Sequence, residues 1–350
     1  MVLLLSNLLA AWKIKLKSGA KVEPKIVSTA STSSTTMAST RDVGNEEAEA
    51  LISQVLDIYG KLHARGSDDL KPCDEVNHLF IDLVGMCVKT ISEDVTNKVL
   101  NDARVIPILP SLRKLCGAAE CHLESHWAKY ISGDTSSTSK NVHDRLAEFP
   151  YYSNYVDLTR MELSALNSLI APSSIPLHRF AFIGSGPLPL TSLCIYQTAA
   201  SFTHPGQNIT AGNSVEVLNI DVNPKATSES TQLCKLLGPS ASGMKFQCSP
   251  AHSSELDLSG FDVVYLAALV GSTQAEKEVL LESVVGRMRE GAYLVVRSAE
   301  RLRRLLYAEF DPTAEKVLDC LDICLAVHPY NFVVNSVIIG KVRSRNAAKE

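Results

Sequence analysis

Short apolar runs alternate with segments of helical periodicity from Arg179 to the end of the chain. The runs read, in order, FAFIG, VEVLNID, MKFQC, FDVVYLAALVG, GAYLVVRS, CLAVHP and NSVIIGKV. Runs that are apolar throughout are typical of strands covered on both faces, as in a mostly parallel sheet wrapped by helices. Only a few residues separate the last two runs, too few for a crossover helix, so these two are predicted to pair antiparallel. The pattern predicts a doubly wound α/β sheet.

The chain before this region reads as helices. Apolar residues recur at three- and four-residue spacing from Ala48 to Leu62, behind an Asn and two Glu residues that suit a helix N-terminus. Further helices are predicted around residues 76–87, from about Ser111 to Ile131, and after the FPYYSNY segment. The stretch GDTSSTSK at 133–140 is predicted to be a loop.

The expected organisation has four parts. Residues 1–44 include a Ser/Thr-rich stretch, STASTSSTTMAST, that holds too little apolar surface to offset its ordering entropy, and they are expected to be disordered. A helical domain at 45–172 precedes a Rossmann-like domain at 173–343. Residues 344–350 are expected to form a tail.

Charge and cysteine usage exclude several classes of protein. The 350 residues hold 38 Asp and Glu against 34 Lys and Arg, without the basic excess that nucleic-acid binding requires. The nine cysteines show no C-x-x-C spacing, which favours reduced thiols and a cytoplasmic location. The apolar run near the N-terminus is shorter than the ~20 residues that span a bilayer, and its lysines follow it, unlike a signal peptide. No membrane partner is expected.

A glycine loop, GSGPLPLTS, follows the first apolar run. Gly184 and Gly186 can accept positive φ and allow a ligand to approach the backbone. Pro187 and Pro189 remove N–H donors that a pyrophosphate would use, which favours a nucleoside without phosphates. A plain strand-to-helix turn is an equally weighted alternative. With a ligand bound, the loop contacts are expected from Gly184, Ser185, Gly186, Pro187 and Leu188.

The ends of two further strands are expected beside this loop. Asp221 ends the second run, where a carboxylate can accept bonds from both hydroxyls of a ribose, although it follows Gly186 by 35 residues and not the usual ~20. Capping of the next helix is the alternative role for Asp221. Ala267 and Ala268 end the fourth run and leave space for a ligand, or simply pack.

Paired side chains in the helix at 111–131 offer two kinds of chemistry. Glu120 and Glu124 share one face in an apolar setting, where burial would raise a carboxylate pKa and make it a usable base. A solvated face is the alternative. His122 and His126 share another face, but HLESH lacks the H-E-x-x-H pattern and a third ligand, so no protein-bound metal is expected.

Another pair of polar side chains falls on the helix after FPYYSNY. Tyr155 and Glu162 lie seven residues apart and share a helical face, so both are expected to project into one cavity. Past the fifth parallel run, Arg297 or Arg301 is a candidate to hold a substrate carboxylate, with surface solvation as the more favoured alternative.

The order of the runs resembles the class I methyltransferase variant of the doubly wound fold. More specifically, GSGPLPLTS, FPYYSNY, CGAAECHLE, FDVVYLAALVG, VRSAERLRRLLY and HPYNFVVNSVIIGK resemble nicotianamine synthase across about 45–343. The resemblance implies joining of three S-adenosylmethionine molecules by aminocarboxypropyl transfer, with one azetidine ring closed and methylthioadenosine released. It implies a metal-chelating product, a role in metal homeostasis, and a helical domain that acts as a lid.

The resemblance also implies residue roles. The cofactor-binding positions are Gly184, Ser185, Gly186, Pro187, Leu188, Asp221, Ala267 and Ala268. The catalytic positions are Glu120, Tyr155 and Glu162, with Glu120 preferred to Glu124 as the acid-base residue. A methyltransferase acting on a small acceptor is the alternative enzyme, and a non-catalytic nucleotide-binding scaffold is the alternative outside enzymes. In each enzyme reading the partner is a small molecule, and the sequence leaves the oligomeric state open.

Overall fold

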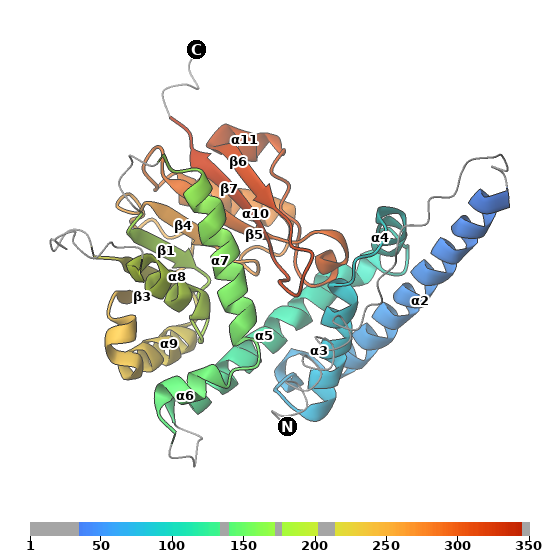
Figure 1. Ribbon diagram of the computed structural model, residues 1–350, viewed down its shortest axis with the longest axis horizontal. Coiled ribbons are helices and arrows are strands. Elements are labelled where there is room, and N and C mark those ends of the chain that lie inside the picture. Colours follow the sequence, from blue (N-terminus) through green and yellow to red (C-terminus); the bar gives the residue numbers. More distant parts are fainter. Residues whose placement is uncertain (1–34, 134–139, 172–176, 202–213, 345–350) are drawn as a thin grey trace, which may run out of the picture.

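The computed structural model describes residues 35–133, 140–171, 177–201 and 214–344, and its centre is one mixed sheet (Figure 1). Seven strands lie in the order β3-β2-β1-β4-β5-β7-β6. The first five are parallel, and β7 is antiparallel to both of its neighbours. The strands are β1 (Arg179–Ile183), β2 (Glu216–Asp221), β3 (Met244–Cys248), β4 (Val263–Leu266), β5 (Tyr293–Ser298), β6 (Leu321–Val327) and β7 (Ser336–Val342). Every predicted run contains or overlaps a strand, and the α/β fold is confirmed.

Helices cover both faces of the sheet and extend beyond one edge (Figure 1). The α-helices are α2 (Thr35–Arg65), α3 (Asp74–Cys87), α4 (Glu93–Leu100), α5 (Leu109–Ser132), α6 (Val142–Ala147), α7 (Tyr152–Ser168), α8 (Leu190–Ser201), α9 (Pro224–Leu237), α10 (Gln274–Val285) and α11 (Glu315–Cys320). The 3-10 helices are η1 (Ser67–Asp69), η2 (Ile106–Ile108), η3 (Gly238–Ala241) and η4 (Arg301–Leu305). None of the helices in the described ranges is long and apolar enough to span a membrane.

Local capping explains where several helices begin. The side chains of Ser92, Asn141, Asn223 and Thr273 each accept a backbone N–H from the first turn of the following helix. The helix α2 departs from the prediction, because it begins at Thr35 and not near Asn45. The Asn and Glu residues interpreted as its N-terminus lie inside it. Residues 35–44 are therefore helical where disorder was expected, and residues 1–34 lie outside the described ranges.

The packing of the cores does not follow the expected boundary at residue 172. One face of the sheet packs with α8 and α9, and the same core takes in α7, α6 and the end of α5. The opposite face packs with α10 and α11. A third core joins α2, α3, α4 and the start of α5, and it also contains Leu302, Leu305 and Leu306, which come after β5. The helices and the sheet thus interlock, and α5 runs through both (Figure 1).

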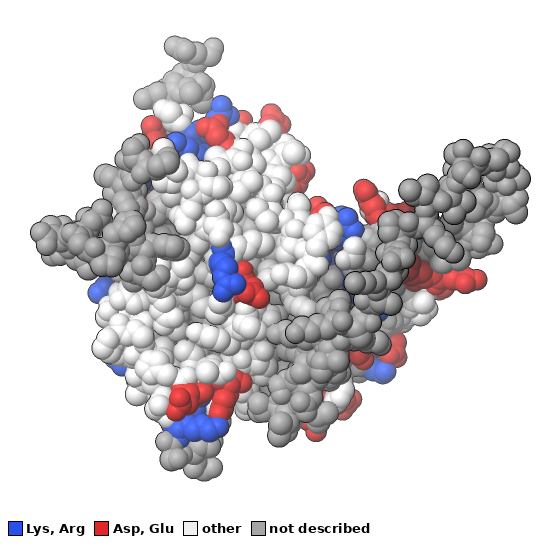
Figure 2. All heavy atoms as spheres, in the orientation of Figure 1, with Lys and Arg blue, Asp and Glu red and all other residues white. Residues whose placement is uncertain are grey.

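The face shown in Figure 2 carries few charged side chains over the sheet and α7. Lysines and arginines on this face lie beside acidic residues (Figure 2). On α7, Arg160 and Asp157 form an exposed ion pair 3.1 Å apart. No basic patch of the kind that contacts a phosphate backbone gathers on this face, among the residues that are described.

Candidate active site

The glycine loop lies where the strand order reverses, between β1 and β4, which is the usual ligand position in open α/β sheets. Gly184 and Gly186 have φ of 83° and 67°, a region that side-chain-bearing residues rarely adopt. The backbone N–H of Gly184 donates to the carbonyl of Ile220 over 2.8 Å, and that of Gly186 donates to Asp221 Oδ2 over 2.8 Å. The loop is therefore fixed to the end of β2 through the carboxylate of Asp221.

A cavity of about 270 Å³ opens at this edge of the sheet. We call it the sheet-edge cavity. Every residue predicted to bind S-adenosylmethionine lines it: Gly184, Ser185, Gly186, Pro187, Leu188, Asp221, Ala267 and Ala268. Asp221 Oδ1 accepts the backbone N–H of Asn223 over 2.8 Å, so both oxygens of this carboxylate are oriented by the backbone and keep further lone pairs for a ligand.

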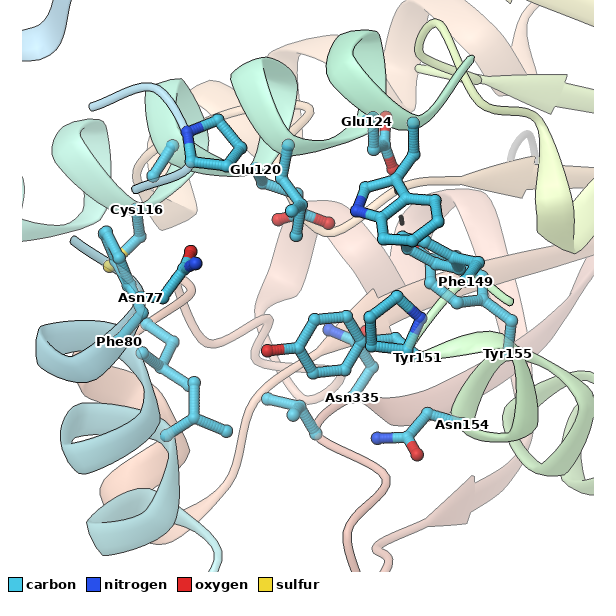
Figure 3. Close-up of a pocket in the computed structure, with 18 of the residues that line it drawn as sticks. Asn77, Phe80, Cys116, Glu120, Glu124, Phe149, Tyr151, Asn154, Tyr155 and Asn335 are labelled. Carbon is cyan, nitrogen blue, oxygen red and sulfur yellow. Dashed lines mark hydrogen bonds between the residues drawn. The ribbon is translucent and has the colours of Figure 1, made fainter. Parts of the chain in front are cut away.

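A second cavity, of about 380 Å³, lies between α3, α5 and α7, and we call it the helical cavity (Figure 3). Its walls are largely apolar and aromatic. Figure 3 shows Phe80 on α3, Phe149 and Tyr151 ahead of α7, and the two glutamates descending from α5. His126 also lines this cavity. Water-excluding walls of this kind strengthen the interactions of the few polar groups inside.

The two cavities meet at a set of polar residues that line both, which we call the shared wall. They are Glu120, Glu124, Tyr155, Arg297, Tyr307 and Asn335. They come from α5, α7, β5, the segment after η4 and the residue before β7. Helices and sheet therefore contribute together to one polar boundary between an apolar chamber and the glycine loop.

The two glutamates of the shared wall are each held by a tyrosine hydroxyl. Tyr307 Oη donates to Glu120 Oε2 over 3.0 Å, and Tyr155 Oη donates to Glu124 Oε1 over 3.1 Å. Burial raises the pKa of Glu120 above the ordinary 4.5, and burial together with the charge of Glu120 raises the pKa of Glu124 well above it. Both side chains are half-buried and line the two cavities, which argues against the solvated-face interpretation.

The tyrosines of this wall remain protonated donors at neutral pH. Burial raises the pKa of Tyr155 and of Tyr307 well above 10.0, and the neighbouring carboxylates raise both further. Tyr155 thus lies where the sequence placed it. Tyr307 was not identified as a site residue, although it ends the VRSAERLRRLLY segment. Its place shortly after a strand end is the signal that could have found it.

Glu162 does not line either cavity, contrary to the expectation that it projects into a chamber with Tyr155. Its side chain is fully buried, and it accepts two bonds from Arg297, Nε to Oε1 at 2.8 Å and Nη2 to Oε2 at 3.1 Å. An unpaired carboxylate is too costly to bury, which is why it turns toward the guanidinium. Glu162 is therefore a partner of Arg297 behind the shared wall.

The arginine candidates separate clearly. Arg297 is buried and part of the shared wall, so surface solvation is excluded for it. Arg301 lies outside both cavities: its Nη1 donates to the carbonyl of Ile91 over 2.8 Å, and its guanidinium stacks on Tyr330. Arg301 joins the sheet to the helices and does not face a ligand site.

The two histidines on α5 have different surroundings. His122 Nε2 lies 3.0 Å from the carbonyl oxygen of Ser67, and His126 faces the helical cavity. Within the described ranges, no three or more His, Cys, Asp or Glu side chains gather closely enough to hold an ion.

Comparison with known proteins identifies the family. The family model described as nicotianamine synthase protein matches residues 44–347. Nicotianamine synthase 3 of Oryza sativa subsp. indica is 36% identical over 300 residues, covering 85% of this chain and 80% of the relative. Nicotianamine synthase 3 of Arabidopsis thaliana is 36% identical over 296 residues, covering 84% of each. The chain belongs to the nicotianamine synthase family.

Solved structures agree on the fold. A variant of MtNAS in complex with S-adenosylmethionine superposes with a TM-score of 0.64 at 19% identity, covering 84% of this chain and 98% of that one. MtNAS in complex with MTA and tNA gives a TM-score of 0.64 at 20% identity, covering 83% and 98%. The predicted fold and the predicted membership of the nicotianamine synthase family are thus confirmed. The cavities described above are the candidate active site.

Proposed function

We propose that this protein makes nicotianamine by condensing three S-adenosylmethionine molecules through their aminocarboxypropyl groups, with release of three methylthioadenosine molecules. Family membership supports the overall reaction. The observation that carries the proposal is the shared wall, because it places two glutamates and two tyrosines between a loop suited to an adenosyl group and a chamber large enough for a second molecule.

The chemistry requires one carbon of the sulfonium to be selected. Three carbons flank S⁺ in S-adenosylmethionine, and an amine can attack either the methyl carbon or Cγ of the methionine part. With the adenosyl group beside Gly184 and Asp221, the aminocarboxypropyl arm reaches the shared wall. An acceptor amine in the helical cavity then approaches Cγ from the other side. Holding the attacking nitrogen about 3 to 3.5 Å from Cγ in the correct orientation contributes a large share of the rate enhancement in such a step.

Each transfer balances as a substitution. The lone pair of the amine forms the new N–Cγ bond, the Cγ–S bond breaks, and sulfur leaves with the electron pair as the neutral thioether of methylthioadenosine. The nitrogen releases one proton, for which Glu120 is the proposed base and Tyr155 the group that orients the amine. A raised carboxylate pKa brings Glu120 closer to the pKa of an amine, which favours proton transfer. Ring closure is the same attack within one molecule.

The setting of the reaction is also a proposal. All nine cysteines are free, which is typical of a reducing compartment, so we place the protein in the cytoplasm. The product carries three carboxylates and several amines, a ligand set suited to metal ions, and a role in metal homeostasis follows. Its partners are expected to be small molecules and not nucleic acid, in keeping with the acidic balance of the chain.

The product pattern tests the proposal. Purified protein incubated with S-adenosylmethionine alone should release methylthioadenosine and build a tricarboxylate in a ratio of three to one, measured by liquid chromatography with mass detection. Adenosylhomocysteine as the main nucleoside product, or no turnover until another acceptor is added, would instead support a methyltransferase. An absence of turnover with tight binding would support a scaffold.

A further inference from the structure

Arg297 is the only lysine or arginine among the described residues that line the two cavities. The same cavities contain Glu120, Glu124 and Asp221. A ligand that carries a carboxylate into this acidic surrounding requires a cation or strong donors at one defined place. The position of Arg297 on the shared wall makes it the one side chain that offers a permanent positive charge there.

The guanidinium of Arg297 is fixed on one edge and unoccupied on another. Nε and Nη2 donate to Glu162, and Nη2 also donates to Thr191 Oγ1 over 2.9 Å. The ring of Phe182 lies beneath it, 5.2 Å from Cζ to the centroid. Nη1 has no acceptor within the described part of the chain, although it carries two N–H groups. Glu162 and Thr191 hold the fork in one orientation and leave Nη1 for a ligand.

Asn335 supplies an independent sign of a ligand at the same place. Its side chain is 9% exposed, it lines both cavities, and its Nδ2 has no hydrogen-bond partner among the described residues. A buried donor without a partner destabilises the folded chain, because it has lost its hydrogen bond to water and gained none. Figure 3 shows the amide of Asn335 among the side chains that surround the cavity, below the helix that carries Glu120. An acceptor from a bound molecule would satisfy this donor.

The sheet register brings the two residues together. Arg297 pairs with Val337 across β5 and β7, and Asn335 lies two residues before Val337. Residues two apart in an extended segment point to the same side, and diagonal neighbours of this kind lie about 7 to 8 Å apart. That separation suits two donors that converge on the oxygens of one carboxylate from opposite sides.

We propose that Arg297 and Asn335 form a carboxylate subsite for the methionine end of the donor S-adenosylmethionine. The proposal rests on the proposed function, because the donor is taken from it. Nη1 of Arg297 donates to one carboxylate oxygen and Nδ2 of Asn335 to the other. Since the adenosyl group is fixed at the glycine loop, anchoring the carboxylate at the shared wall fixes the arm between them. Cγ is then presented to the acceptor amine, and the methyl carbon is turned away.

Binding of three ligands to the wild-type protein tests the subsite without any substitution. Calorimetry would compare S-adenosylmethionine, its decarboxylated form and methylthioadenosine. Without the subsite, the acidic wall would favour the decarboxylated ligand, because that ligand carries the larger positive charge. Which of the two ligands binds more tightly therefore distinguishes the two cases. The subsite predicts that S-adenosylmethionine binds at least about tenfold more tightly. Equal binding, or tighter binding of the decarboxylated ligand, would overturn the proposal.

Asn335→Asp provides the second test, because it replaces the donor by an acceptor of the same shape. This substitution should weaken the binding of S-adenosylmethionine by about tenfold or more and change the affinity for methylthioadenosine by less than about twofold. The variant should also bind the decarboxylated ligand more tightly than S-adenosylmethionine. Asn101→Asp makes the same charge change at the exposed end of α4 and should change none of these. Unchanged selectivity in Asn335→Asp would reject the subsite. If this variant fails to bind methylthioadenosine, the wild-type comparison decides alone.

The outcome remains separable from that of the proposed function. A wild-type protein that prefers S-adenosylmethionine to the decarboxylated ligand, yet releases adenosylhomocysteine, would retain the subsite and lose the synthase assignment. A protein that releases methylthioadenosine and a tricarboxylate, yet does not distinguish the two ligands, would retain the synthase assignment and lose the subsite.

Discussion

Gly186 lies directly against the carboxylate of Glu124, so that a Cβ on this residue would overlap Glu124 Oε2. The glycine loop of the sheet and the acidic face of α5 therefore touch at a point where a Cβ fits only if the Glu124 carboxylate moves. This contact connects the expected adenosyl site to the expected proton-transfer site across two parts of the chain that are far apart in sequence.

Substitution of Gly186 should abolish ligand binding. Gly186→Val places a branched side chain at φ of 67° and against Glu124, so the loop cannot keep its shape. We expect no calorimetric signal with S-adenosylmethionine while circular dichroism remains native. Gly238→Ala is the matched control, since Gly238 has φ of 60° with open space around it. Undiminished binding in Gly186→Val would show that the loop does not seat the ligand.

Glu120→Gln should reduce turnover by a factor of about 100 or more, the usual contribution of a general base, and leave binding of S-adenosylmethionine intact. The isosteric amide keeps the shape of the side chain and removes the proton acceptor. Single-turnover release of methylthioadenosine is the measurement. Glu124→Gln is the matched comparison one helical turn away, and if it alone were inactive, Glu124 would be the base.

The rate should depend on pH through the buried acids. Burial raises the pKa of Glu120 above 4.5, and a base acts only when ionised, so turnover should fall on the acid side at a pH above that of an ordinary glutamate. The rate constant of the wild-type protein, followed from pH 4 to 9 under saturating substrate, checks this. An acid limb at pH 4.5 or below would show that the base is a solvated carboxylate.

The contribution of Glu124 to the free energy of unfolding should fall as pH rises, whereas the turnover rate should rise. The pKa of Glu124 is raised in the folded state, so between 4.5 and that raised value the folded chain holds a proton that the unfolded chain releases. The free energy of unfolding contributed by this group therefore falls as pH rises through the window. Glu124→Gln removes this ionisable group. The difference in free energy of unfolding between the variant and the wild type, measured by urea unfolding, should therefore shift in favour of the variant from pH 4.5 upward. A difference between variant and wild type that does not change with pH would contradict the raised pKa of Glu124.

The buried pair of Glu162 and Arg297 predicts a large cost when it is broken. Glu162→Gln leaves the buried charge of Arg297 without its carboxylate partner, and such losses cost about 3 to 5 kcal/mol. Asp157→Asn breaks an exposed ion pair on the same helix and should cost less than about 1 kcal/mol. Urea unfolding of both variants measures the two values. If both variants lost less than about 1 kcal/mol of unfolding free energy, the ion pair of Glu162 and Arg297 would contribute little to stability.

The sequence predicts what local patterns determine. The runs of β1, β4, β5 and β7 were recognised because burial on both faces leaves an unbroken apolar signature. The last hairpin followed from the length of its connection. The residues of the glycine loop, Asp221, Ala267 and Ala268 were found because strand ends in a parallel sheet meet at one edge. Their part in ligand binding stays a prediction.

What the sequence could not predict depends on pairs that are distant along the chain. Arg297 meets Glu162 at a separation of 135 residues, and Tyr307 meets Glu120 at 187. Helical spacing put Glu162 and Tyr155 on one face, but it could not show that a buried guanidinium lies opposite Glu162. Asn335 opens the NSVIIGKV run, but nothing in that run distinguishes it as a site residue, and only the sheet register reveals its neighbour.

The three leucines that follow β5 bear on how molecules enter and leave. The core of α2, α3 and α4 buries Leu302, Leu305 and Leu306. Exposing each side chain to water would cost about 1.5 to 3 kcal/mol of free energy. Swinging the helices away as a rigid lid would thus cost about 5 to 9 kcal/mol, comparable with the stability of a whole domain. Substrate exchange should proceed through side-chain movements at the cavity mouths, with the reaction volume built into the folded chain and not reassembled at each turnover.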